Sequence, residues 1–202
     1  MLKESLYYSK ILLFGEYGII HDSMGLSIPY NDYNGKLLFS AAPDASSKGS
    51  NQKLEKFLSH LEGLEAEGKL PCDLDLKKFR ADLNKGMHFD SSIPQGFGVG
   101  SSGAIVAAIY DNYSQDKIAS DANMSNEKFI ALKKIFGTLE SYYHGKSSGL
   151  DPLICYLNLP VLIKSKSEVG TVGLPDTSTG KGAIFLMNTG TTGKTQPLVQ
   201  HF

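Results

Sequence analysis

The chain has few of the features that mark secreted, membrane-spanning or metal-cluster proteins. Its 202 residues include only two cysteines, Cys72 and Cys155. They have no metal-ligand spacing, so they indicate free thiols in a reducing compartment, which we take to be the cytoplasm. The apolar run at 11–14 is cut short by Gly15 and Glu16. It is therefore too short for a signal-peptide core or a membrane span.

The chain also lacks an excess of positive or negative charge. The formal net charge is −1 and no long block of like charges occurs, so neither nucleic acid nor an anionic membrane surface is indicated as a partner. Hydrophobic residues make up 41% of the sequence, which is enough for a substantial core. The length fits one large domain, or one domain with part of a second, and the composition fits an enzyme of small metabolites.

Helical and strand patterns are mixed without regular alternation. Apolar spacing and capping residues predict helices at 54–68, 76–85, from 101 onwards and at 125–144, with Ser125 as an N-cap. Short apolar runs predict strands at 6–14, 35–42, 160–164 and 182–188. The serine- and glycine-rich segment 43–51 predicts a surface loop, and 165–181 is polar. This pattern favours an α+β fold over a doubly wound one.

The stretch 94–104, PQGFGVGSSGA, is the most informative part of the chain. Gly96, Gly98 and Gly100 let the backbone turn its N–H groups to one side, and a helix is expected to begin near Ser101. The first turn of a helix has unpaired N–H donors and the positive end of the macrodipole. The loop is therefore predicted to wrap a phosphate.

Three other interpretations of this stretch compete. The spacing of Gly98, Gly100 and Gly103 satisfies a dinucleotide-binding fingerprint, but residues 87–94 form a poor apolar run that ends in proline, where that motif needs a buried strand. A P-loop would need a lysine where Ser101 stands. The simplest interpretation is a glycine-rich turn that only caps a core helix. Two further motifs in the chain make this interpretation less favoured than a phosphate loop.

Those motifs are SKILLFGEYGIIH at 9–21 and ESYYHGKSSGLD at 140–151. Together with the glycine loop, and in the same order, they resemble the GHMP kinases, a family that includes galactose, homoserine, mevalonate and phosphomevalonate kinases. The resemblance is strongest to the mevalonate kinases and spans nearly the whole chain. It implies transfer of the γ-phosphate of ATP to mevalonate, with ATP and Mg²⁺ as cofactors. The residues that it implies in phosphate binding are Gly96, Gly98, Gly100, Ser101, Ser102 and Gly103.

The resemblance also implies catalytic and metal-binding residues. Asp151 would be the general base on the substrate hydroxyl, and Ser102 and Glu140 would hold Mg²⁺, which needs few protein oxygens. Lys10 would keep the Asp151 carboxylate ionised and offset charge on the γ-phosphate. Taken alone, Glu140 is a solvated helix carboxylate, Lys10 an exposed strand lysine, and the pair Asp151-Pro152 a simple turn.

Substrate contacts are implied at Glu16, Tyr17, His21 and Thr195. Tyr17 stands where the family usually has histidine, and residue 193 is glycine where many mevalonate kinases have arginine. For His144, four residues after Glu140, we expect a supporting or helix-capping role rather than metal ligation.

The implied fold is a ribosomal-S5-like N-terminal domain at 1–181, followed at 182–202 by the start of a ferredoxin-like domain. The family's third, glycine-rich motif does not occur before residue 202, so we expect a fragment with little or no activity alone. Two alternatives remain: a GHMP kinase or diphosphomevalonate decarboxylase with another acceptor, and a non-catalytic nucleotide-binding module. The family resemblance is compatible with a homodimer.

Overall fold

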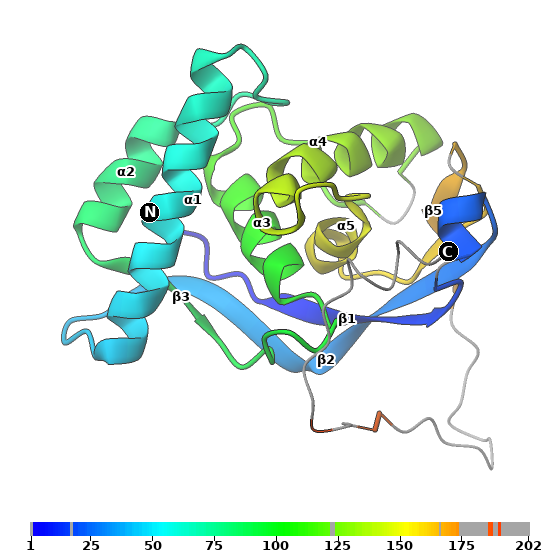
Figure 1. Ribbon diagram of the computed structural model, residues 1–202, viewed down its shortest axis with the longest axis horizontal. Coiled ribbons are helices and arrows are strands. Elements are labelled where there is room, and N and C mark those ends of the chain that lie inside the picture. The colour runs from blue at the N-terminus through cyan, green and yellow to red at the C-terminus, as the bar shows by residue number, and fades with distance from the viewer. Residues whose placement is uncertain are drawn as a thin grey trace.

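The computed structural model describes residues 2–16, 18–121, 124–165, 167–173, 186, 187 and 190. Within these ranges the chain forms one five-stranded sheet and five α-helices (Figure 1). The strands are β1 (Tyr7–Phe14), β2 (Gly25–Phe39), β3 (Met87–Ser91), β4 (Val161–Ile163) and β5 (Val169–Thr171). The helices are α1 (Ala45–Ala66), α2 (Leu76–Asn84), α3 (Ser101–Tyr113), α4 (Asn126–His144) and α5 (Leu150–Leu157), with a 3₁₀ turn, η1, at Gly18–His21.

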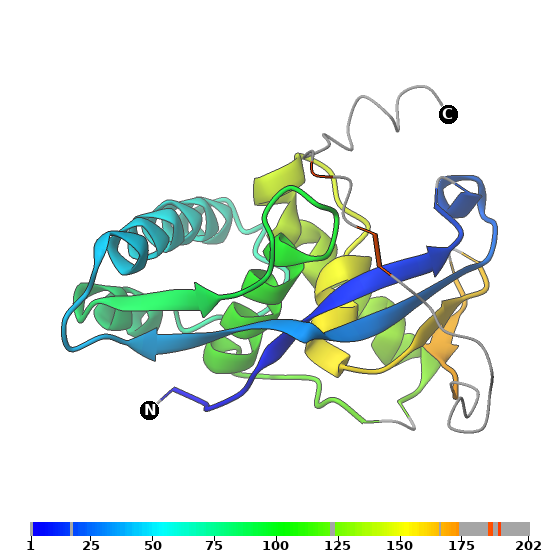
Figure 2. The same ribbon diagram turned by 90° about the horizontal axis from the view of Figure 1, so that it is seen from below.

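The long strand β2 organises the sheet. It pairs antiparallel with β1, β3 and β4, and β4 pairs antiparallel with β5. The helices lie together on one face of this sheet, as Figures 1 and 2 show from two directions. Antiparallel strands with helices on one face agree with the predicted α+β class.

Helix α3 is the centre of the core. Residues 103, 104 and 106–111 are buried, so the helix is covered on nearly all sides, by the sheet, α4 and α5. A helix that is apolar around its whole circumference is stable only when it is enclosed in this way. The loop that precedes α3 is therefore attached to the most firmly packed element of the fold.

The predicted loop at 43–51 is wrong, because α1 begins at Ala45. Asp44 caps the helix by accepting a hydrogen bond from the Ser47 N–H at 2.8 Å. The Ser50 hydroxyl donates to the Phe89 carbonyl, and the Asn51 amide donates to the Met87 carbonyl. These polar side chains therefore bond to β3 and the preceding turn instead of competing with the helix backbone.

The strand predictions also needed correction. Residues 87–91 form β3 despite the weak apolar pattern, because Met87, His88 and Phe89 are all buried and β3 packs against α1. β3 pairs antiparallel with β2, which is not the parallel arrangement of a dinucleotide-binding unit. β2 begins at Gly25, ten residues before the predicted start, and β5 lies in a segment for which the sequence indicated only polarity.

The other predicted elements occur close to their expected positions. α2 ends just before Gly86, whose φ is +85°, and α4 follows Ser125 as its N-cap. The strand expected at 182–188 and the domain expected at 182–202 lie outside the described residues, except for residues 186, 187 and 190. No helix in the described ranges is long and apolar enough to cross a membrane.

A buried carboxylate fastens the N-terminal segment to α3. Asp111, whose side chain is 10% exposed, accepts hydrogen bonds from Lys3 Nζ at 2.8 Å, Lys117 Nζ at 3.1 Å and Tyr7 Oη at 2.9 Å. Burial alone would raise the pKa of Asp111, but these hydrogen bonds outweigh it and hold the pKa below its usual range. The stability that this carboxylate contributes is therefore present above the pKa of an unfolded aspartate and is lost as the pH falls through the lower folded pKa.

Replacing Asp111 by asparagine should lower the free energy of unfolding at pH 7 by about 2 kcal/mol, because the charge partner of Lys3 and Lys117 is lost. The difference between wild type and variant should shrink as the pH is lowered below about 3. Urea titrations at several pH values measure both effects. Glu168→Gln is the matched control, since it removes an exposed ion pair with Lys164 and should change stability by less than about 0.5 kcal/mol. Equal effects of the two substitutions would contradict the role given to Asp111.

Candidate active site

The glycine loop has the backbone geometry expected from the sequence. Gly96, Gly98 and Gly100 have φ values of +83°, +70° and +86°, in the left-handed region that favours glycine. α3 begins at Ser101, and no side chain in the described part of the chain caps its first turn. The N–H groups at this end of α3 are therefore available for an anion.

β1 and α5 bring a cation and a carboxylate to this end of α3. Lys10 Nζ lies 2.9 Å from Asp151 Oδ1. The Lys10 main-chain N–H donates to the Val99 carbonyl at 3.0 Å, which ties β1 to the glycine loop. The Lys10 side chain is only 9% exposed, whereas that of Asp151 is 35% exposed. A small molecule can therefore reach Asp151, whereas the Lys10 side chain is buried behind that carboxylate.

The electrostatics of Lys10 follow from this position. Burial by itself lowers the pKa of Lys10. The charge of Asp151 and its hydrogen bond with Lys10 together outweigh this effect, so the pKa of Lys10 lies above its usual value. Glu16 contributes a weaker effect in the same direction. Lys10 is thus a fixed positive charge at neutral pH.

Glu140, near the end of α4, is the second carboxylate of the site. Its side chain accepts a hydrogen bond from Ser102 Oγ at 3.0 Å and another from Ser147 Oγ at 2.5 Å. His144 Nε2 lies 3.0 Å from the same Ser102 Oγ. Since the Ser102 hydroxyl donates to Glu140, the His144 ring nitrogen is placed to donate to Ser102. The first turn of α3 and the last turns of α4 are joined through this one hydroxyl.

Burial makes the charged form of Glu140 costly. The residue is 3% exposed, and burial together with the nearby charge of Asp151 raises the pKa of Glu140 to about 7. The hydrogen bonds from Ser147 and Ser102 and the charge of Lys10 act in the opposite direction but do not cancel this effect. A divalent cation beside the carboxylate would favour its ionised form.

Ser102 and Glu140 fit Mg²⁺ chemically, since a hydroxyl and a carboxylate oxygen at hydrogen-bond distance are hard oxygen donors. In the described ranges no group of three or more His, Cys, Asp or Glu side chains gathers as a metal centre. A site with two protein oxygens therefore suits an ion that takes its other ligands from phosphates and water.

Two glycines allow the close packing that positions Asp151. A Cβ on Gly103 would lie 2.8 Å from the Asp151 carbonyl carbon, so α3 and α5 could not approach as they do. Gly149 has φ +74°, and a Cβ there would overlap the Lys133 carbonyl oxygen on α4. The loop before Asp151 is therefore fixed by backbone contact with α4.

Gly149→Ala should destabilise the fold by at least about 2 kcal/mol, because it adds both left-handed backbone strain and a backbone clash. Gly49→Ala is the matched control. Gly49 lies in α1 without a positive φ, and a Cβ there would have no atom within 4 Å, so alanine should stabilise by about 0.5–1 kcal/mol through helix propensity. Thermal unfolding should show a lower melting temperature for Gly149→Ala and a higher one for Gly49→Ala than for wild type. A neutral Gly149→Ala would contradict the packing argument.

The residues expected to contact the substrate are not part of this group of contacts. Glu16 lies in the turn after β1, and His21 ends η1; both side chains are exposed. Tyr17 and Thr195 lie outside the described residues. The structure thus groups Lys10, Ser102, Glu140 and Asp151 around the start of α3, with Glu16 near enough to act on Lys10.

Sequence reasoning missed two contacts of the site. Ser147 binds Glu140, and a hydroxyl in the glycine-flanked loop just before Asp151 was the available signal. Cys155 is buried beneath the glycine loop, with Sγ 3.7 Å from the Gly100 carbonyl, and no pattern in the sequence indicated this. The supporting role expected for His144 agrees with its contact to Ser102.

Comparison with known proteins finds one family model that matches part of the chain. The family model of the GHMP kinases N terminal domain matches residues 72–158, which include the glycine loop, Glu140 and Asp151. No curated protein matches the chain. Over these residues the chain is similar to the N-terminal domain of the GHMP kinases.

Among solved structures, the chain is similar to the mevalonate kinase of L. major in complex with R-mevalonate, at 19% identity and a TM-score of 0.46, covering 80% of this chain and 48% of that one. It is also similar to mevalonate kinase from methicillin-resistant Staphylococcus aureus MRSA252, at 18% identity and a TM-score of 0.43, covering 83% of this chain and 54% of that one. The chain spans about half the length of these structures.

Proposed function

We propose that the chain is the ATP-binding part of a small-molecule kinase that transfers the γ-phosphoryl group of ATP to an alcohol, with mevalonate as the leading acceptor. The observation that carries this proposal is the grouping of Lys10, Ser102, Glu140 and Asp151 at the start of α3. Phosphoryl transfer needs anion donors, a cation, oxygen ligands for a metal ion and a group that positions the attacking hydroxyl. The site offers one candidate for each.

In the proposed reaction, Asp151 accepts the proton of the acceptor hydroxyl, whose oxygen then bonds to the γ-phosphorus. The bond from the γ-phosphorus to the β–γ bridging oxygen breaks, and ADP leaves. Lys10, fixed 2.9 Å from Asp151, orients that carboxylate and lies where it can offset charge on the transferred group. The loop at 96–100 and the first turn of α3 would hold the phosphates through main-chain N–H groups.

Mg²⁺, held by Ser102 and Glu140, would neutralise charge on the phosphate oxygens. Ser102→Ala and Glu140→Gln should each raise the Mg²⁺ concentration needed for half-maximal rate by about tenfold, since each weakens one of very few protein ligands. The double variant should be less than additive because the two side chains share one site. Glu55→Gln, on the exposed side of α1, is the control. An unchanged Mg²⁺ titration in both single variants would remove the metal assignment.

We also propose the acceptor contacts at Glu16, Tyr17, His21 and Thr195, and the domain boundaries 1–181 and 182–202. The ferredoxin-like character of the second segment is part of this proposal. Because the chain spans about half the length of the matched structures, closure of the site by further residues is expected to contribute to turnover.

The test is a panel of alcohols, including mevalonate, phosphomevalonate, homoserine and galactose, incubated with Mg²⁺ and ATP and followed by ³¹P NMR. It is run on the 202-residue chain and on the chain supplemented with a C-terminal domain of the family. We expect phosphorylated mevalonate as the main product of the supplemented protein. Transfer to another alcohol would replace mevalonate as the acceptor, and ATP binding without transfer in either sample would indicate a non-catalytic nucleotide-binding module.

A further inference from the structure

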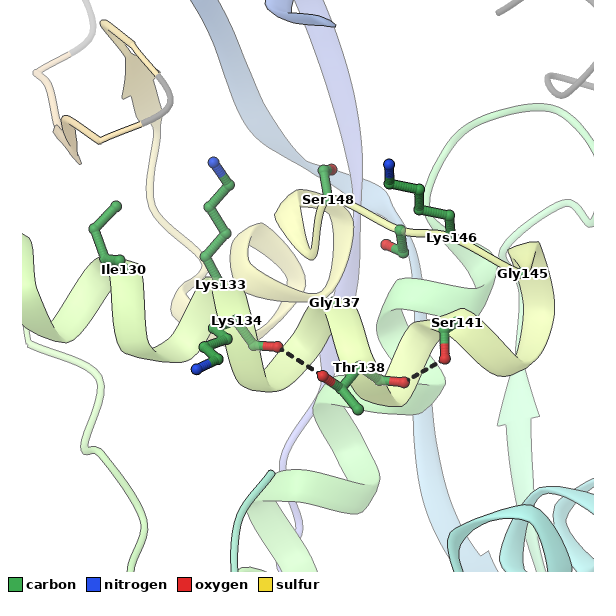
Figure 3. A pocket seen from close by; sticks show the side chains of 10 residues that line it. Ile130, Lys133, Lys134, Gly137, Thr138, Ser141, Gly145, Lys146 and Ser148 are labelled. Atoms are coloured by element: carbon green, nitrogen blue, oxygen red, sulfur yellow. Dashed lines mark hydrogen bonds between the residues drawn. The ribbon is translucent and has the colours of Figure 1, made fainter. Parts of the chain in front are cut away.

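A second feature lies beside the candidate site, on the other side of the loop that leads to Asp151. It is a cavity of about 510 Å³ between α4 and the loop at 145–148 (Figure 3). It is widely open to solvent, so it can receive one group of a small molecule rather than enclose the whole molecule. Its α4 wall is formed by residues three or four positions apart or adjacent: Ile130, Lys133, Lys134, Gly137, Thr138 and Ser141. Lys10, Ser102, Glu140 and Asp151 do not line it.

The cavity is built by backbone packing. Gly137 has no side chain, and a Cβ there would lie 3.0 Å from the Ser147 carbonyl oxygen. At the end of the loop, Gly149 packs so closely on α4 that a Cβ would lie 2.6 Å from the Gly137 nitrogen. The spacing between the two walls is therefore fixed by the fold.

The charge of the lining is of one sign. It includes Lys133, Lys134 and Lys146, and no Asp or Glu is among the described residues that form it. Within the described part of the chain, none of the three ammonium groups has a carboxylate within 4 Å. In Figure 3 the side chains of Lys133 and Lys146 extend to the same side of α4, with Ser148 between them, and that of Lys134 extends to the other side.

The charged form of Lys133 is disfavoured by this arrangement. It is half-buried, and burial lowers its pKa, while the more distant charge of Asp22 offsets only part of this effect. A bound anion would supply the missing opposite charge. The Ser148 hydroxyl accepts only a long hydrogen bond, 3.4 Å from the Leu150 N–H, so its own proton remains available for an oxyanion.

We propose that this cavity binds the phosphate or carboxylate group of a small molecule, held between Lys133 and Lys146 with Ser148 as a hydroxyl donor. The site shares a wall with the candidate phosphoryl-transfer site, because Ser147 lines the cavity and donates to Glu140. The oxyanion therefore belongs either to the far end of the acceptor or to a separate ligand. Binding itself does not depend on the proposed kinase function.

The test is calorimetric titration of the 202-residue chain with inorganic pyrophosphate at pH 7 and constant ionic strength. Lys133→Gln and Lys146→Gln should each weaken binding by about tenfold or more, the effect of losing one charged hydrogen bond. Lys128→Gln is the matched control, because Lys128 is an exposed lysine of the same helix that does not line the cavity. It should leave binding unchanged. Lys146 is exposed, so its replacement should not disturb folding.

Residue-specific acylation with mass spectrometry gives a second measurement, in which pyrophosphate should protect Lys133 and Lys146 but not Lys128. Because the glycine loop is itself proposed to bind phosphates, only an effect of pyrophosphate that Lys146→Gln removes is attributed to the cavity in a kinase assay. Such an effect on the acceptor KM alone assigns the cavity to the acceptor, and one on kcat assigns it to a separate ligand; both support the site. No saturable binding, or equal affinities of the Lys133→Gln, Lys146→Gln and Lys128→Gln variants, would overturn the proposal even if the chain is a kinase.

Discussion

Asp151→Asn should lower kcat by at least about 10²-fold while leaving the affinity for Mg²⁺ and ATP nearly unchanged. The amide keeps the size of the side chain but cannot accept the proton of the acceptor hydroxyl. Asp151 is also the partly exposed member of its ion pair with Lys10, so the acceptor can reach it. Steady-state kinetics, with nucleotide affinity measured separately, distinguish a loss of chemistry from a loss of binding.

The control for this substitution is Asp116→Asn, which makes the same chemical change at an exposed position after α3. It should leave kcat unaltered. Activity of Asp151→Asn within a few-fold of wild type would remove Asp151 from the catalytic role. A parallel loss of nucleotide affinity would show instead that the substitution had disturbed the glycine loop.

Lys10→Met should lower kcat/KM by about 10²–10³-fold, the effect of removing one group that stabilises charge in a transition state. Methionine keeps most of the apolar stem but leaves the buried carboxyl of Glu140 and the charge of Asp151 without their nearby cation. Kinetics and thermal unfolding of the same sample separate the catalytic effect from the structural one.

Lys10→Arg should not restore activity. The Lys10 side chain is only 9% exposed and its Nζ lies 2.9 Å from Asp151 Oδ1, so the bulkier, planar guanidinium has little room to take the same place. Lys36→Met, at an exposed position of β2, is the matched control and should leave kcat/KM unchanged. Full activity of Lys10→Arg would mean that the site needs only a positive charge there, and full activity of Lys10→Met would exclude Lys10 from the chemistry.

The local elements of the site could be predicted because their signals are short-range. Alternating glycines before an apolar stretch predicted a loop that turns its N–H groups to one side and a helix that begins near Ser101, where α3 starts. The grouping of Lys10, Glu140 and Asp151 came from resemblance to a family and not from spacing, since the three residues lie on β1, α4 and α5. Contacts across the fold, such as that of Ser147 with Glu140, depend on the packing of α4 against the next loop.

The errors have a common physical cause. Polar side chains at 45–51 suggested a loop because serine and asparagine compete with helix backbone hydrogen bonds when they have no other partner. Here Ser50 and Asn51 find partners on and beside β3, which the sequence could not reveal. β3 itself was overlooked because its buried residues include His88, and tertiary burial outweighed the weak apolar pattern.

The most direct test of the site is a crystal structure of the chain with Mg²⁺ and a non-hydrolysable ATP analogue. The proposed function predicts that the triphosphate lies along residues 96–101, that the metal ion is bound by Ser102 and Glu140, and that the γ-phosphate faces Lys10 and Asp151. A triphosphate bound elsewhere, or a metal ion that contacts neither Ser102 nor Glu140, would contradict it.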